Sequence, residues 1–135
     1  MPSALPSDTS ITNSKSPPEP ASAVDIIITL AINPENKEQV EANLLKAGEW
    51  IEKNEPGCLQ WEVFYLEATG EMVLVERFND LPTARKYHPE NRKKDGMIDG
   101  GLKWANEIVE KGWLSQEPDI KVLSRRGGFG LRKWQ

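Results

Sequence analysis

Apolar positions along the chain follow two periods, and each change of period marks the boundary of an expected element. Residues 25–32 read DIIITLAI, a β-branched run that is apolar on both sides and predicts a strand. The next stretch predicts a helix, because its apolar residues recur at steps of three and four and form one core-facing stripe. These residues are Val40, Leu44, Ala47 and Ile51.

The ends of this helix have their own signals. Asn33 is expected to cap it and Pro34 to occupy its first position, because proline needs no hydrogen-bond acceptor there. Pro56 and Gly57 predict its end, since proline lacks the N–H that would continue the helix and glycine tolerates the positive φ of a helix terminus.

Two strand-like runs follow and predict a hairpin. They cover Leu59–Leu66 and Met72–Phe78 and are joined across residues 67–70. Strict alternation predicts two sets on the first run: Leu59, Trp61, Val63 and Tyr65 on one face, and Cys58, Phe64 and Leu66 on the other. Because both faces are apolar, we expect a second cover for the sheet, and a second copy of the chain would supply it as a homodimer.

The C-terminal half predicts helix, loop, helix and strand. Asn79 and Asp80 are expected to cap a short helix, Leu81–Tyr87. A polar loop over 89–99 precedes a helix from about residue 100 to 111 whose inward set would be Leu102, Ala105, Ile108 and Val109, ended by Gly112. Asp119–Ser124 predicts the last strand. The order is that of a ferredoxin-like α+β fold, β-α-β-β-α-β, with an antiparallel sheet and helices on one face.

Composition divides the chain into three parts. Residues 1–23 are rich in proline and serine and predict a disordered leader, residues 24–124 form the single α+β domain, and residues 125–135 form a basic, aromatic tail. The net charge of −4 is uneven, because residues 24–124 hold 12 Lys and Arg against 19 Asp and Glu. An acidic body disfavours nucleic acid as a partner.

One cysteine, Cys58, provides no intramolecular disulfide, and the N-terminus has no secretory pattern. The longest apolar run is too short to span a membrane. A cytoplasmic protein without a membrane partner is therefore expected. No metal-ligand spacing is visible, so no metal site is expected.

Three stretches resemble the antibiotic biosynthesis monooxygenase domain family: EPGCLQWEVF, then MVLVERFND, then a short helix that ends at a histidine. The resemblance covers about 24–123. It implies a dimeric α+β barrel whose members include oxygenases that use no metal or flavin and act on anthrones, quinols and related aromatics. Haem-degrading members have an asparagine in the first strand, which is absent here, so that branch is disfavoured.

Oxidation by O2 without a cofactor requires a base that converts the substrate to an electron-rich anion in a dry site. His88, the only histidine, has the side chain whose ordinary pKa is nearest 7, and it precedes Pro89, which disfavours helical geometry there. It is our candidate catalytic base. A helix-terminal or surface role is the alternative.

The candidate substrate-binding residues surround this position. Tyr87 and Trp104 are preferred because the helical layer borders the site in the family, and Trp61 and Phe78 could stack on a planar aromatic. Glu76 lies among apolar neighbours and needs a partner, which Arg85 or His88 could supply. For each aromatic residue, core packing is the competing interpretation. Two other functions remain open: a non-catalytic dimeric binding protein, and an isomerase or cyclase that transfers protons without oxygen.

Overall fold

The computed structural model describes residues 22–86 and 102–128. Four strands and three α-helices follow one another along these residues. Their bounds are β2 Val24–Ala31, the 3-10 turn η2 Pro34–Asn36, α1 Lys37–Asn54, β3 Cys58–Leu66, β4 Glu71–Phe78, α2 Leu81–Arg85, α3 Leu102–Glu110 and β5 Asp119–Ser124.

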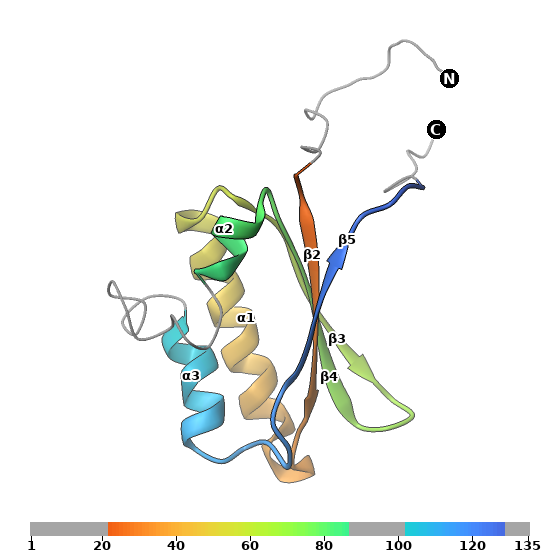
Figure 1. Ribbon diagram of the computed structural model, residues 1–135. Coiled ribbons are helices and arrows are strands. Elements are labelled where there is room, and N and C mark those ends of the chain that lie inside the picture. The colour runs from red at the N-terminus through yellow and green to blue at the C-terminus, as the bar shows by residue number, and fades with distance from the viewer. Residues whose placement is uncertain (1–21, 87–101, 129–135) are drawn as a thin grey trace, which may run out of the picture.

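The strands form one antiparallel sheet in the order β3-β4-β2-β5, and the helices cover one of its faces (Figure 1). This confirms the predicted ferredoxin-like α+β fold. The hairpin turn is also as predicted: the Gly70 N–H donates to the Leu66 carbonyl at 2.8 Å, and Gly70 takes a φ of +74°. Such a φ strains any residue with a Cβ, so glycine suits this turn.

The core lies between the sheet and the helices. All four apolar residues of the predicted α1 stripe are buried, at 2% exposure or less. Alternation along β4 is regular, because Met72, Leu74, Glu76 and Phe78 are buried on the helix side. Val73, Val75 and Arg77 therefore lie on the opposite face, where the Arg77 guanidinium pairs with Asp25 of the neighbouring β2.

One prediction about β3 is wrong. A β-bulge interrupts its pairing with β4 between Cys58 and Gln60, so Leu59 has no partner in the register. The extra residue reverses the alternation before it, as a bulge must. Cys58 consequently lies on the helix side with Trp61, packed on the cluster of Phe78, whereas Leu59 is 42% exposed.

Both predicted helix starts can be compared with the structure. Asn33 does not cap α1: its side chain makes no cap hydrogen bond and donates instead to the Gly112 carbonyl at 3.0 Å, while Pro34 opens the 3-10 turn before α1 begins at Lys37. Asp80 does cap α2, accepting from the Thr83 N–H at 2.8 Å. That bond holds the pKa of Asp80 below its ordinary value.

The predicted inward set of α3 is correct in part. Leu102 and Ile108 are buried, but Val109 is 51% exposed and Asn106 is buried in place of an apolar residue. Gly112 ends the segment with a φ of +69°. Of the predicted leader and tail, residues 1–21 and 129–135 lie outside the described residues, while 125–128 are exposed.

Candidate functional site

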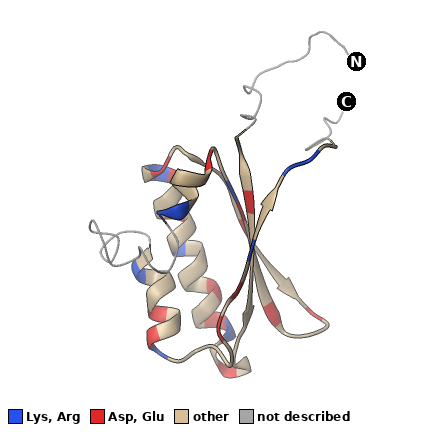
Figure 2. Cartoon of the chain, in the orientation of Figure 1, with Lys and Arg blue, Asp and Glu red and all other residues tan. Residues whose placement is uncertain are grey.

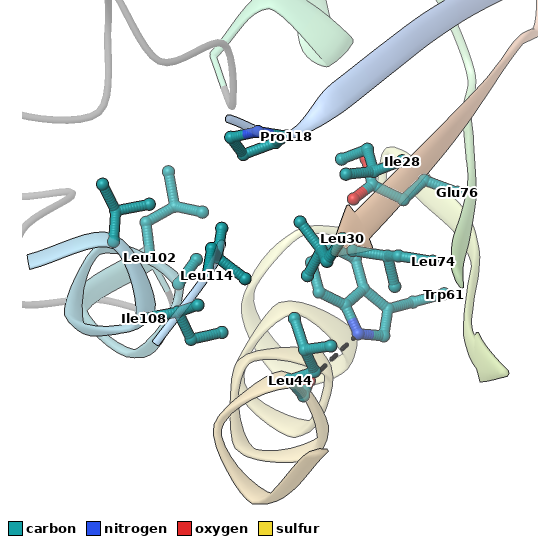
Figure 3. A pocket seen from close by; sticks show the side chains of 12 residues that line it. Ile28, Leu30, Leu44, Trp61, Leu74, Glu76, Leu102, Ile108, Leu114 and Pro118 are labelled. Carbon is teal, nitrogen blue, oxygen red and sulfur yellow. Dashed lines mark hydrogen bonds between the residues drawn. The ribbon is translucent and has the colours of Figure 1, made fainter. Parts of the chain in front are cut away.

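A small cavity lies between the sheet and the helical layer (Figure 3). Its volume is about 40 Å³. Side chains from three strands (β2, β3 and β4), from α1 and α3, and from the segment between α3 and β5 line it: Ile28, Leu30, Leu44, Trp61, Leu74, Glu76, Leu102, Ala105, Ile108, Val109, Leu114 and Pro118. Among these described lining residues, Glu76 is the one with an ionisable side chain. The site is therefore an apolar space with one carboxyl group at its wall.

Glu76 owes its position to the strand period. It follows Leu74 by two residues, so it points to the helix side like its buried neighbours, and only 3% of it is exposed. Its register partners are Ile26 on β2 and Trp61 on β3. A carboxyl group held among apolar side chains is desolvated, so it interacts strongly with any polar group that enters the space.

Trp61 forms the wall next to Glu76 and is held by α1. Its indole N–H donates to the Leu44 carbonyl at 3.2 Å, the bond drawn in Figure 3. The ring lies so close to the helix that a Cβ on Gly48 would be 2.4 Å from Trp61 Cδ1. Gly48 is thus required for the approach of the indole, and the glycine inside the helical pattern was the signal for it in the sequence.

The helical wall is joined to α1 by Asn43, which sequence reasoning did not single out. Its Nδ2 donates to the Trp104 carbonyl at 3.1 Å and to Glu107 Oε1 at 2.7 Å, and the residue is 6% exposed. A polar residue within the core-facing stripe of α1 was the available signal, because such a group needs buried partners.

Cys58 lies on the other side of Trp61. Burial raises the pKa of its thiol to about 11, a backbone hydrogen bond with Gln60 lowers it in part, and the nearby charges of Glu76 and Glu55 raise it further. The thiol is therefore protonated at neutral pH, which makes it a poor nucleophile.

The structure brings two of the predicted site residues to the cavity and places three elsewhere. Trp61 and Glu76 line it. Phe78 is fully buried in the cluster with Ile51 and Leu102. Trp104 is half-buried on α3 and Arg85 is exposed at the end of α2, and neither lines the cavity. Tyr87 and His88 lie outside the described residues.

Metal and membrane features can be stated for the described part of the chain. Within residues 22–86 and 102–128, no three histidine, cysteine, aspartate or glutamate side chains gather as metal ligands would. In the same ranges, none of the helices has the length and apolar character that crossing a bilayer requires.

The fold and the cavity define an α+β domain with a largely apolar site, and comparison with known proteins shows which family it resembles. Residues 24–89 match the model of the family "Antibiotic biosynthesis monooxygenase". This match confirms the resemblance noted in the sequence. The matched range runs from β2 to just beyond α2, so it includes Trp61, Glu76 and His88. No curated protein is similar to the chain at a significant level.

Solved structures share the fold at low sequence identity. The Mycobacterium tuberculosis protein Rv0793 is 20% identical with a TM-score of 0.63, over 81% of this chain and all of that one. A candidate antibiotic biosynthesis monooxygenase from Caulobacter crescentus is 17% identical with a TM-score of 0.62, over 78% and 92%. Another from Nitrosomonas europaea is 13% identical with a TM-score of 0.62, over 81% and 95%. These likenesses establish the fold.

Proposed function

We propose that the protein is a monooxygenase that oxidises a polycyclic phenol, anthrone or quinol with O2 and without a cofactor. The observation that supports this most directly is the largely apolar cavity beside Glu76, together with the match of residues 24–89 to the antibiotic biosynthesis monooxygenase family. A space that excludes bulk water favours a reaction whose intermediate is an electron-rich carbanion or phenolate, because bulk water would protonate it.

The reaction balances without any other redox partner. A base removes a proton from the substrate, and the resulting anion supplies electrons to O2. One oxygen atom forms the new carbon–oxygen bond, and the other leaves as water with two hydrogens from the substrate. An anthrone CH2 thus becomes a quinone C=O, and the substrate itself is oxidised by four electrons while O2 is reduced.

The sequence and the lining of the cavity suggest a role for each of three residues. His88 is the proposed base. The Glu76 carboxyl accepts a hydrogen bond from a substrate hydroxyl, and the face of Trp61 stacks on the ring system. Sites for drug-sized ligands occupy about 300–1,000 Å³. Since the cavity measures about 40 Å³, binding requires the helical wall to move away from the sheet.

A homodimer is part of the same proposal. The sheet face opposite the helices carries Phe64 at 49%, Leu66 at 43% and Leu123 at 42% exposure, with the half-buried Val75 between the strands. An exposed apolar face of this kind is stabilised by a second copy of itself. A monomeric mass by light scattering at micromolar concentration would contradict this part.

The test measures O2 consumption and product formation with a panel of anthrones and hydroquinones. We expect turnover with one ¹⁸O atom from ¹⁸O2 in the product, a large loss in His88→Ala, and a matching loss in Ala105→Phe, which fills the cavity at the α3 wall. Glu67→Ala, an exposed position in the turn between β3 and β4, is the control and should retain turnover.

Other results of this test would support one of the alternative functions. Unchanged turnover in His88→Ala would remove that residue from the role of base. Turnover under anaerobic conditions would indicate an isomerase or cyclase. Stoichiometric quenching of tryptophan fluorescence by planar aromatics, with no product, would indicate a binding protein.

A further inference from the structure

A second hollow lies at the outer edge of the sheet, between α1 and β3. Its volume is about 490 Å³. Gly48, Ile51 and Trp61 form part of its lining, and its rim carries two leucines, Leu45 at 52% and Leu59 at 42% exposure. We call this hollow the edge groove. The bulge in β3 creates its strand side, because it turns Leu59 outward.

Acidic residues border the edge groove along α1. Glu49 and Glu52, both exposed, line it beside Leu45. Glu38 and Glu41 lie further toward the start of the same helix, and the exposed Lys46 and Lys53 alternate with the glutamates. Figure 2 shows acidic and basic positions together along the helical layer. Within the described residues, neither Glu49 nor Glu52 has a salt bridge, whereas Glu55 pairs with Lys86 at 3.1 Å. The edge groove therefore combines apolar lining, such as Ile51 and Trp61, with carboxylates on its helix side.

The chain itself contains a segment of the opposite character. Residues 125–135 read RRGGFGLRKWQ, with four cationic side chains and the aromatic Phe129 and Trp134. The described residues end at Gly128, so residues 129–135 lie beyond them. Arg132 and Lys133 stand directly before Trp134, which matches a rim of carboxylates next to an apolar floor.

The sheet register places the start of this segment at the correct end of the molecule. Ser124 pairs with Val24, Val24 with Phe78, and Phe78 with Cys58. The last residue of β5 is thus level with the residue at which the edge groove meets β3. Three strand spacings separate them, roughly 14 Å. Residues 125–135 span up to about 36 Å when extended, so the segment reaches the edge groove with chain to spare.

We propose that residues 129–135 bind in the edge groove of their own chain. Trp134 packs on Leu45 and Leu59, and Arg132 and Lys133 pair with Glu49 and Glu52. The segment would shield the outer edge of β3, which pairs only with β4 among the described strands. It would also reduce repulsion among the α1 glutamates. Attachment to the same chain favours this binding over a free partner, because it raises the effective concentration of the segment.

A spin label at the chain end tests the proposal in the full-length protein. Gln135→Cys in a Cys58→Ser background carries the label, and ¹⁵N amide signals report its distance. We expect strong broadening at Leu45, Glu49 and Leu59 and none at the hairpin turn around Gly70, which lies at the other end of β3. Broadening at the groove residues should weaken in 1 M salt, where the Debye length is about 3 Å.

Matched variants separate this binding from accidental proximity. Glu49→Lys with Glu52→Lys reverses the charge of the rim and should abolish the broadening. Trp134→Ser removes the indole that the proposal packs on the two leucines, and it should abolish the broadening as well. Glu110→Lys with Glu117→Lys changes the same charge at exposed positions away from the edge groove and should leave it intact. Broadening that survives both the rim reversal and Trp134→Ser would overturn the proposal, as would broadening centred on the open sheet face.

A mixing experiment identifies the donor chain. Spin-labelled ¹⁴N protein is mixed with unlabelled ¹⁵N protein. We expect no broadening between chains. Broadening at the edge groove in this mixture would assign the binding to a second copy and overturn the same-chain proposal.

Discussion

Trp61 packs closely against α1 at Gly48, and Gly48→Ala perturbs this packing directly. The added methyl carbon would lie 2.4 Å from Trp61 Cδ1 and 2.6 Å from Nε1. Ordinary contact begins at 3.4 Å, so the indole must withdraw by about 1 Å or the helix must shift by as much. Either movement lengthens the 3.2 Å hydrogen bond from Trp61 to the Leu44 carbonyl.

Three contributions determine how much Gly48→Ala changes the free energy of unfolding. Overpacking in a core costs about 1–3 kcal/mol. Loss of the indole hydrogen bond costs about 1 kcal/mol. Alanine favours the helix over glycine by about 1 kcal/mol. The last two offset each other, so we expect a destabilisation of about 1–3 kcal/mol, although glycine-to-alanine substitutions in helices ordinarily stabilise.

Urea unfolding followed by far-ultraviolet circular dichroism measures this difference. The control is the same substitution in a Trp61→Leu background, where the clash is absent and Gly48→Ala should stabilise by about 1 kcal/mol. The sign of the effect thus depends on the residue at position 61. If Gly48→Ala stabilises the protein that retains Trp61, the close approach of ring and helix is refuted.

Three further predictions concern buried and titrating groups. Asn43→Leu removes two hydrogen bonds to α3 and should lower the free energy of unfolding by about 2 kcal/mol in urea; an unchanged midpoint would contradict the role given to Asn43. Asp80→Ala removes the α2 cap. Because folding lowers the pKa of Asp80, the stability that this carboxylate contributes is complete above the ordinary carboxyl range and is lost as pH falls through the lowered pKa. Thermal melts should therefore show the gap from the unsubstituted protein narrowing in acid, and a constant gap would speak against the cap. The Cys58 thiol should alkylate slowly at neutral pH and accelerate until about pH 11, whereas a rate that levels off near pH 9.0 would mean an unperturbed thiol.

Periodic features of the fold were predictable because they repeat. The α1 stripe and the buried set of β4 each rest on several residues that agree with one another, so a single exception does not change the assignment. The cap at Asp80 was predictable because an aspartate directly before a short helix has few competing hydrogen-bond donors.

Local exceptions were not predictable from periodicity. Alternation alone assigns Leu59 to the face of Trp61, and one inserted residue reverses that assignment. Asn33 has the residue type of a cap, but its side chain bonds to the Gly112 carbonyl, a partner 79 residues away that no local rule includes. Long-range packing decided both cases.

The candidate site also has a part that the sequence predicts and a part that depends on long-range packing. Glu76 was identified from its apolar neighbours on one strand, and the cavity beside it comes from elements that the strand pattern does not contain, such as Leu114 and Pro118. Phe78 and Trp104 share the aromatic character of Trp61, and only their three-dimensional positions separate core packing from the cavity wall. The roles of Tyr87 and His88 stay predictions.

The pairing of Val24 with Ser124 makes the first residue of β2 and the last residue of β5 direct neighbours in the sheet. A short linker could therefore close the domain into a ring, and new ends could be opened in the turn between β3 and β4, as circular permutation requires. Such a permuted chain would keep every strand pairing while changing which strands are made first. The effect of the order of synthesis on folding would then be measurable with the architecture unchanged.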